Sequence, residues 1–449
     1  MKSFFKKIIV SILTLEARAV LRKYKPKIVA ITGSVGKTST KDAVYAILSS
    51  HFYTRKSYKS FNSEIGVPLT ILGLPNGWNN PILWLRNIFR GFLLCIPSTS
   101  YRLLTTNYPD WLVLEVGADR PGDIENLSKW LKPDAAIVTR FGKVPVHVEF
   151  FPSQQEVIRE KSFLVQALKD GGTLFLNNDD EDVRAMEKIK RTSSVVSWGI
   201  ESEVDFQASN FEFAYEEKDD KEVPSGIMFR VNYKGNSVPI TVSGTLGRQQ
   251  VYPVLAALAF GGSMGFNMVE MSEIMAGHKT APGRMRLLQG VKHTTIIDDT
   301  YNSSPVALKE ALRALKEIEL KNKPRAKLKA KKIAVLGDML ELGKYSGEEH
   351  QKAGAEAKES CDILVTVGVR ARNIALGAMS NGMDEKNIFQ FDTSTEASKP
   401  VEDLLKEGDI VLVKGSQGVR MEKIVEEIMA YPEQKEELLV RQEAEWQRK

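Results

Sequence analysis

A short glycine-containing loop is the part of the sequence that points most directly to chemistry. Residues 32–38 read TGSVGKT, between the apolar run 28–31 and a helical stretch that begins at Lys37. Glycines allow backbone N–H groups to point toward one anion, and the first turn of a helix favours negative charge. Lys37 would reach the terminal phosphates of a nucleotide, and the hydroxyl of Thr38 would bind magnesium. The loop therefore predicts a nucleotide site, with a chance Gly-Lys-Thr as the alternative.

The loop is shorter than the standard phosphate-binding form, because Ala30 occupies the position of its first glycine. Lys37 is also a candidate catalytic residue, since its charge would offset that of a transferring phosphoryl group. The predicted nucleotide-binding residues here are those of the loop and of the first helical turn: Thr32, Gly33, Ser34, Val35, Gly36, Lys37, Thr38 and Ser39.

Other polar residues could complete such a site, although few of them would be chosen in isolation. Glu115 lies in the apolar run 111–116, and a carboxylate at a strand end that faces the loop could hold magnesium with Thr38. His147 is an isolated histidine, which more often has a structural role. Lys161 is one lysine of a helical stretch, where an exposed side chain is the simplest interpretation.

Short apolar runs alternate with helical stretches in the first part of the chain, at 28–31, 111–116, 135–139 and 173–176. Continuous apolar strands separated by helices indicate a parallel, doubly wound sheet. From about residue 203 to residue 242 apolar and polar side chains alternate, with a turn at 234–236. This pattern predicts antiparallel strands appended to the main sheet.

A second α/β cycle follows a joint at 279–284. Its apolar runs lie near 294–297, 332–336, 363–367, 388–391 and 410–413, with helical stretches between them. We therefore expect an α/β protein: a phosphate-binding-loop domain with a parallel sheet and appended antiparallel strands, then a Rossmann-like domain. The expected boundaries are 1–26 for an N-terminal amphipathic helix, 27–280 for the central nucleotide-binding domain and 281–449 for the C-terminal domain.

Composition narrows the class of protein. The chain has 449 residues, of which 43% are hydrophobic and 27% charged, as in a soluble protein of two or three domains. A net charge of +5 gives no case for nucleic-acid binding, and the lysine-rich run 321–332 is interpreted as a solvated loop. Cys95 and Cys361 are the only cysteines, which excludes a disulfide framework or a four-cysteine zinc site and fits a reducing cytoplasm.

Two apolar segments raise the question of a membrane. Residues 4–15 are apolar at helical spacing beside three lysines, and residues 78–96 are crowded with apolar side chains around Arg86 and Arg90. Both are too short or too interrupted to span a bilayer, and the first lacks a cleavage site for a signal peptide. Packing within the protein is the favoured interpretation. The alternative is that residues 1–25 and 78–104 make peripheral contact with the inner face of the membrane. We expect the chain to be a cytoplasmic monomer.

Several motifs, taken in order, resemble those of the Mur ligase family. The shortened loop is the form found there. The segments similar to its MurF type are 60–70 (SFNSEIGVPLT), 114–124 (LEVGADRPGDI), 298–305 (DDTYNSSP), 335–343 (VLGDMLELG) and 413–422 (VKGSQGVRME). The resemblance runs from about residue 27 to residue 430. It implies an ATP-dependent, ADP-forming ligase that makes an amide bond through an acyl phosphate, adding D-alanyl-D-alanine to a muramoyl-peptide precursor of peptidoglycan.

The resemblance also implies roles for single residues. Thr38 and Glu115 would hold one magnesium ion, and His147 would bind a second. Lys161 stands fourteen residues after His147, like the family lysine that reacts with carbon dioxide to form a carbamate, an anionic oxygen ligand for magnesium. Arg284 would reach the γ-phosphate from the last domain. The catalytic residues would thus be Lys37, His147, Lys161 and Arg284, and the remaining nucleotide contacts Asn177, Asp179, Asp299 and Tyr301.

The sequence departs from the family pattern in three places. Family members carry a domain before the loop that binds the UDP part of the precursor, whereas 26 residues precede residue 27 here. We therefore expect a different acceptor contact, with 78–104 as a replacement surface and a lipid-linked acceptor as a hypothesis. The segment 139–147 is longer than its family counterpart, and Gln249 and Gln250 stand where His-Asn is usual. Adenine contacts are expected to differ accordingly.

Two rival functions remain open. A ligase that extends a glutamate chain on folate, or another Mur-like ligase with a different acceptor, would share the architecture. The segment 338–343 and the pair Tyr301-Asn302 favour the cell-wall type over the folate type. A nucleotide-binding scaffold without catalysis is the alternative from another class. The argument against that scaffold is the joint presence of the catalytic and metal-binding candidates Lys37, Thr38, Glu115, His147 and Lys161.

Overall fold

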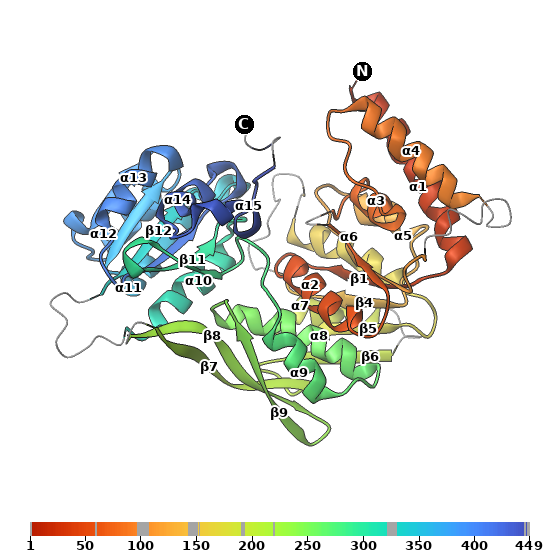
Figure 1. The fold of residues 1–449 in the computed structure, drawn as a ribbon, viewed down its shortest axis with the longest axis horizontal. Coiled ribbons are helices and arrows are strands. Elements are labelled where there is room, and N and C mark those ends of the chain that lie inside the picture. The colour runs from red at the N-terminus through yellow and green to blue at the C-terminus, as the bar shows by residue number, and fades with distance from the viewer. Residues whose placement is uncertain are drawn as a thin grey trace.

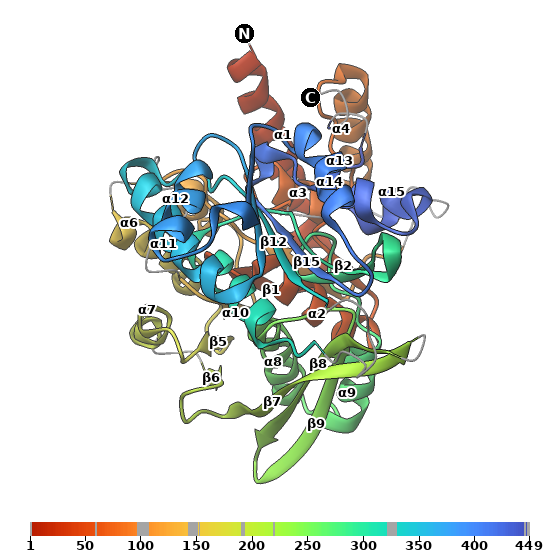
Figure 2. The same cartoon turned by 90° about the vertical axis from the view of Figure 1, so that its left-hand side faces the viewer.

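The computed structural model describes residues 2–58, 61–96, 107–141, 151, 153–189, 194–218, 221–320, 330–443 and 446. Within these ranges the chain forms two α/β bodies, each built around one sheet, and a pair of helices at one end (Figure 1). The antiparallel strands of residues 206–243 lie at the opposite end from this helix pair, as Figures 1 and 2 both show. The two bodies meet between these ends.

Over the described residues the first sheet has nine strands, in the order β2-β3-β1-β4-β5-β6-β7-β8-β9. Its parallel part consists of β1 (Lys27–Thr32), β2 (Thr54–Lys56), β3 (Trp111–Glu115), β4 (Ala135–Val138), β5 (Thr173–Asn177) and β6 (Ser194–Gly199). β7 (Phe206–Lys218) pairs parallel to β6, and β8 (Lys221–Tyr233) and β9 (Asn236–Ser243) follow antiparallel. The predicted sheet is confirmed. Two strands are missing from the prediction: the short β2, whose TRK sequence has no apolar run, and β6.

The apolar runs of the parallel strands are continuous because helices cover both faces of the sheet. Val29 and Ile31 of β1 lie in a core with α2 (Lys37–Ser49), α8 (Val251–Ser263) and α9 (Met268–Ala276). Ile28 and Ala30 lie in the core of the opposite face, with α1 (Lys2–Tyr24), α3 (Gly66–Leu72), α5 (Asp123–Ser128) and α6 (Gln154–Gln166). A short α7 (Glu181–Arg184) follows β5. The phosphate-binding loop thus leaves a strand that is held on both sides.

In the described part of the second body, six strands form a sheet in the order β10-β11-β15-β12-β13-β14. These are β10 (Arg286–Gln289), β11 (Thr295–Asp299), β12 (Lys332–Gly337), β13 (Ile363–Val367), β14 (Ile388–Phe391) and β15 (Ile410–Lys414). Its helices are α10 (Pro305–Glu317), α11 (Ser346–Ser360), α12 (Arg372–Ser380), α13 (Ser394–Leu404), α14 (Glu422–Ile428) and α15 (Lys435–Leu438). The Rossmann-like prediction is confirmed, except that β10 adds an antiparallel edge.

The helix α1 lies beside α4 (Pro81–Cys95). Leu13, Ala17 and Val20 of α1 are buried, and the Lys23 ammonium donates to the carbonyl oxygens of Leu94 at 3.0 Å and Ile96 at 2.6 Å. A cation at the end of a helix is favourable because the last carbonyls carry partial negative charge. The two predicted helices therefore pack on the protein. Among the described residues, no helix is both long and apolar enough to cross a membrane.

Candidate active site

The loop between β1 and α2 has a backbone that requires glycine at two positions. Gly33 has φ 142° and Gly36, at the N-terminus of α2, has φ 86°. A Cβ atom at Gly33 would also collide with the Thr139 hydroxyl. The amides of Ser34 and Val35 donate to the Arg140 carbonyl at 2.7 and 3.2 Å, which ties the loop to the end of β4. The first amides of α2 have no acceptor within the helix, so they suit an anion.

Glu115 ends β3, the strand beside β1, and both of its oxygens are held. The Thr38 hydroxyl donates to Glu115 Oε2 at 3.0 Å, and the Asn62 amide donates to Oε1 at 3.1 Å. The Glu115 backbone amide donates to the Ser57 hydroxyl at 3.1 Å. The side chain is 1% exposed. A buried carboxylate beside a threonine hydroxyl offers the hard oxygen donors that magnesium prefers.

Two lysines of α2 surround this carboxylate. Lys37 Nζ donates to the Ser34 carbonyl at 3.3 Å, and burial lowers the pKa of Lys37 while the Glu115 charge opposes that shift. One turn later, Lys41 is 1% exposed, with Nζ 3.8 Å from Glu115 Oε2 and 3.7 Å from Asp42 Oδ1. Lys41 is not among the residues predicted from the sequence. Its helical spacing from Lys37 was the available signal, since residues four apart share a helix face.

Lys161 is buried, which corrects the interpretation of an exposed helix lysine. Its neighbour Glu160 accepts the backbone amides of Gly122, Ile124 and Glu125 at 2.9, 2.6 and 3.0 Å, and so binds α6 to the start of α5. This packing leaves Lys161 4% exposed. Burial, and then the charge of Lys37, lower the pKa of Lys161 to about 7. Much of this amine is therefore neutral at neutral pH.

Arg284 and Tyr301 approach from the side of the second body. The Arg284 guanidinium lies over the Tyr301 ring, 3.8 Å from its centroid. Its Nε is buried and has no hydrogen-bond partner among the residues that the structure describes. A buried N–H without an acceptor is costly, and an anion in an adjoining cavity could provide one. The backbone here is fixed by Asp298, which accepts the Gly283 amide at 3.0 Å.

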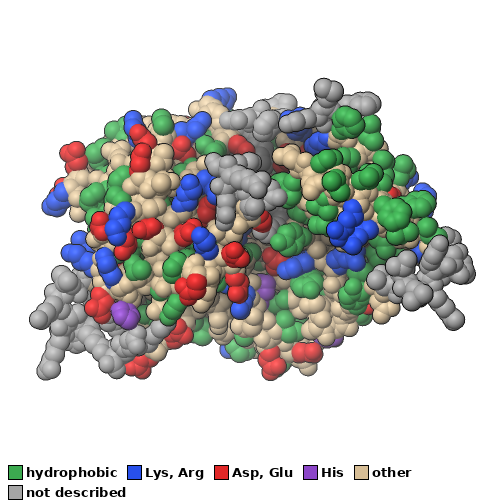
Figure 3. Space-filling model, turned by 45° about the horizontal axis from the view of Figure 1, so that its top comes forward, with side chains coloured by type: hydrophobic (Ala, Val, Ile, Leu, Met, Phe, Trp, Pro, Cys, Tyr) green, Lys and Arg blue, Asp and Glu red, His purple; other side chains and the backbone are tan. Residues whose placement is uncertain are grey.

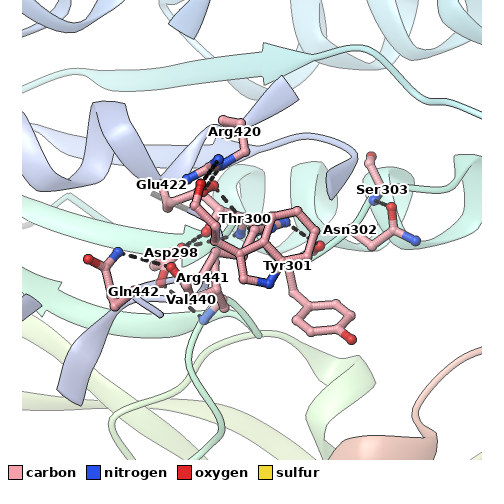
Figure 4. Close-up of polar contacts among 12 residues, drawn as sticks. Asp298, Thr300, Tyr301, Asn302, Ser303, Arg420, Glu422, Val440, Arg441 and Gln442 are labelled. Atoms are coloured by element: carbon pink, nitrogen blue, oxygen red, sulfur yellow. Dashed lines mark hydrogen bonds and ion pairs between the residues drawn. The ribbon is translucent and has the colours of Figure 1, made fainter. Parts of the chain in front are cut away.

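The segment after α15 holds the loop that carries Tyr301 (Figure 4). Arg441 is 7% exposed, and its Nη2 donates to the carbonyl oxygens of Thr300 at 2.9 Å and Tyr301 at 2.7 Å. Its Nη1 lies 3.2 Å from Glu422, whose other oxygen pairs with Arg420 at 2.5 Å. Burial lowers the pKa of Arg441 and the Glu422 charge opposes the shift. The C-terminal segment therefore fixes the backbone on both sides of the Thr300–Tyr301 peptide bond.

A cavity of about 300 Å³ between the two bodies brings most of the predicted residues together. Its lining includes Ser34, Val35, Gly36, Lys37, Thr38, Glu115, Lys161, Arg284 and Tyr301. A larger cavity of about 500 Å³ beside β7 and α10 has none of the predicted residues in its lining. The smaller cavity therefore has the stronger case as the active site, because it combines the loop, a strand-end carboxylate and two cations.

Six predicted residues do not line this cavity: Thr32, Gly33, Ser39, Asn177, Asp179 and Asp299. The first three belong to the loop and the first helical turn. Asp179 accepts the backbone amides of Ile200, Glu201 and Ser202 at 2.6 to 3.1 Å, and Asn177 accepts the Asp179 amide at 3.2 Å. Asp299 forms a buried ion pair with Lys414 at 2.6 Å. The side chains of Asn177, Asp179 and Asp299 therefore stabilise the structure around the site. Asn177 and Asp179 do so by accepting backbone amides, and Asp299 does so through its ion pair with Lys414.

His147 lies outside the described residues. The cavity is also lined by polar residues that the sequence did not single out: Asn62, Asp119, Asn302, Ser303, Ser304 and Gln417. Asn62 lies in the segment 60–70, which resembles the family, and this was the only signal in the sequence for a role of its amide. Its role depends on the distance to Glu115, which lies 53 residues away in the chain, and sequence spacing does not reveal such a contact.

Two family models and several known proteins match most of the chain. Residues 31–82 and 95–261 match the Mur ligase middle domain, and residues 283–417 match the family model described as Mur ligase, glutamate ligase domain. The UDP-N-acetylmuramoyl-tripeptide--D-alanyl-D-alanine ligase of Bacillus subtilis (strain 168) is 26% identical over 417 residues, which cover 93% of this chain and 79% of that protein.

Solved structures share the fold of this chain. The MurF ligase from Thermotoga maritima, determined in complex with ADP, is 25% identical, with a TM-score of 0.73 over 93% of this chain and 83% of that one. Mycobacterium tuberculosis folylpolyglutamate synthase, 15% identical with a TM-score of 0.61, covers 92% of this chain and 94% of its own and shares the fold alone.

The fold and the site define an enzyme with two bodies: the first carries a phosphate-binding loop, and the second is Rossmann-like. The chain belongs to the Mur ligase family, a family of ADP-forming ligases, and the two matched regions cover more than three quarters of its length.

Proposed function

We propose that this chain is the ligase that adds D-alanyl-D-alanine to a muramoyl-peptide precursor of peptidoglycan. The observation that carries the proposal is the single cavity in which Lys37, Thr38 and Glu115 face Arg284 and Tyr301. The relatives named for this reaction, which match over most of the chain, support the choice of substrates. The enzyme acts on small molecules.

The reaction is an ATP-dependent amide synthesis. The precursor carboxylate attacks the γ-phosphate, the bond to the bridging oxygen breaks, and ADP leaves with that electron pair. The amine of the dipeptide then attacks the acyl phosphate, loses a proton, and the tetrahedral intermediate expels phosphate. Lys37 offsets charge on the transferring group, and Arg284 approaches it from the second body. Because positioning dominates such chemistry, closure of the two bodies is the expected conformational step.

The donor set suits magnesium. Thr38 and Glu115 would hold the ion, which when bound neutralises charge on the phosphate oxygens. Within the described residues no three acidic, histidine or cysteine side chains converge. Magnesium commonly takes its other ligands from phosphate and water, so two protein oxygens fit this role. A second ion, with His147 as a ligand, remains part of the proposal.

Lys161 is proposed to carry a carbamate. Its neutral amine attacks carbon dioxide, a nitrogen–carbon bond forms, and one proton leaves, so that a cation becomes an anionic oxygen ligand. The buried position and the pKa of about 7 support this step, because the neutral amine is the form that reacts. We also propose a cytoplasmic monomer whose residues 1–25 and 78–104 touch the inner face of the membrane.

The test is ADP release by the purified full-length chain with UDP-muramoyl-tripeptide and D-alanyl-D-alanine. We expect release that depends on both substrates, and a loss of about 1,000-fold or more in Lys37→Ala. The matched control is Lys129→Ala, an exposed lysine outside the cavity, which should retain full activity. Release with folate and glutamate instead would assign the folate-type reaction. ATP binding with no substrate-stimulated release would favour the scaffold.

A further inference from the structure

The net positive charge of the protein is concentrated on the helix pair α1 and α4. Together these helices carry eight lysine and arginine residues and one acidic residue, Glu16, a balance of +7. The whole chain carries +5, so everything outside the pair carries −2. Such asymmetry is typical of a surface that meets an anionic partner.

The same helices expose large apolar side chains in stripes. On α4 these are Ile82, Leu85, Phe89 and Phe92, which are 77, 71, 62 and 57% exposed. Their spacing of three or four residues places them on one face of the helix. On α1, Phe5 and Leu15 are 61 and 63% exposed. In Figure 3 hydrophobic side chains gather over this end of the molecule, with lysine and arginine side chains among them.

The stripe is not a core face left open by poor packing. α4 has its own inward face, where Asn87 and Gly91 are buried. The Glu16 carboxylate of α1 lies against Gly91, where a Cβ atom would have to displace it. The Asn80 side chain caps the start of α4 by accepting the amides of Ile82 and Leu83 at 3.0 and 3.1 Å. The helix is therefore firmly built, and its apolar stripe faces outward.

We propose that α1 and α4 form a docking surface for an anionic lipid bilayer. Phe89, Leu85 and their neighbours enter the boundary between headgroups and acyl chains, while Arg86 and Arg90 meet lipid phosphates. Charge favours an anionic bilayer over a second copy of this chain, because the basic residues around the two apolar stripes would repel each other. This inference specifies the membrane contact proposed above, and it does not depend on the ligase reaction.

Vesicle sedimentation of the full-length chain tests the docking surface. Vesicles of neutral phosphatidylcholine are compared with vesicles that also contain phosphatidylglycerol. We expect binding to the mixed vesicles that weakens as salt is added. Arg86→Gln with Arg90→Gln should lower partitioning roughly 25-fold, at about fivefold for each basic residue. Leu85→Ser with Phe89→Ser should lower it roughly 100-fold.

Matched control variants distinguish effects at the docking surface from the general effect of losing an exposed apolar or charged side chain. Val269, 57% exposed on α9, controls for an apolar change as Val269→Ser, and Lys188→Gln with Lys344→Gln controls for charge. Both controls should bind vesicles like the parent chain. Unchanged thermal midpoints and ADP release in solution would show that the docking variants are folded. Failure of ligase activity with intact vesicle binding would overturn the proposed reaction and leave the docking surface standing.

Three results would overturn the proposal. The first is a parent chain that stays in the supernatant with phosphatidylglycerol vesicles at low salt. The second is binding that the α4 substitutions leave unchanged. The third is a dimer in light scattering that the same substitutions dissociate, which would assign the stripe to self-association.

Discussion

Replacing Arg441 with methionine should loosen the loop that carries Tyr301. Methionine keeps much of the buried stem, so the change removes mainly the guanidinium. The carbonyls of Thr300 and Tyr301 then lose their donor, and Glu422 loses one of its two arginines. An unpaired buried carbonyl costs about 1–3 kcal/mol. Since two carbonyls lose their donor while Arg420 still pairs with Glu422, we expect a total loss of about 2–6 kcal/mol in the stability of the second body.

The assay is hydrogen exchange of peptides that cover residues 296–304, alongside denaturant unfolding. Exchange of this loop should accelerate roughly 100-fold in Arg441→Met. Arg420→Met is the matched control, because it also removes a partner of Glu422 but leaves both carbonyls bonded to Arg441. If Arg441→Met exchanged no faster than this control, the reasoning that the C-terminal segment fixes the Tyr301 loop would be refuted.

Four further changes follow from the structure. Gly33→Ala should abolish nucleotide binding in calorimetry, because of φ 142° and the collision with Thr139. Glu115→Gln should weaken magnesium-dependent ADP release about 100-fold, as measured by a magnesium titration at fixed ATP. The carbamate carbon signal of Lys161 in ¹³C-bicarbonate should grow as pH rises through about 7, since deprotonation produces the reactive amine. Burial raises the pKa of Glu16 from 4.5 to about 7, so the folded state binds the extra proton and the free energy of unfolding should fall as pH rises between these values. Glu16→Gln should remove that dependence in denaturant midpoints, and an unchanged pH profile would contradict it.

Local patterns predicted the parts of the site that lie on continuous elements. The loop could be recognised because a buried strand precedes it and a helix follows, and Glu115 because its strand ends beside that loop. The burial of Lys161 could not be predicted, since it depends on Glu160 reaching amides that lie 35 to 38 residues earlier in the chain. The same holds for Arg441, whose contacts with Thr300 and Tyr301 span 140 residues or more.

From the sequence it was hardest to distinguish side chains that stabilise the structure around the site from side chains that line the cavity. Asp179 and Asp299 are polar residues at or just beyond strand ends, as ligand-binding residues often are in α/β proteins. The structure shows their carboxylates bonded to nearby backbone amides and, for Asp299, to Lys414. A sequence pattern gives the place of such a carboxylate but not its partner, so the two roles look alike before the fold is known.

The bond between Glu160 and the start of α5 also limits how this protein can change. Because Glu160 binds three backbone amides, it sets the rotation of α6 and hence the direction of its neighbour Lys161. One inserted residue in the preceding turns would rotate both by about 100°. That change would withdraw the lysine from the cavity and the carboxylate from the amides together. We therefore expect insertions and deletions to be tolerated in the loops around α6 but not within the helix. The length of α6 is thus more strongly constrained than the identity of most of its residues.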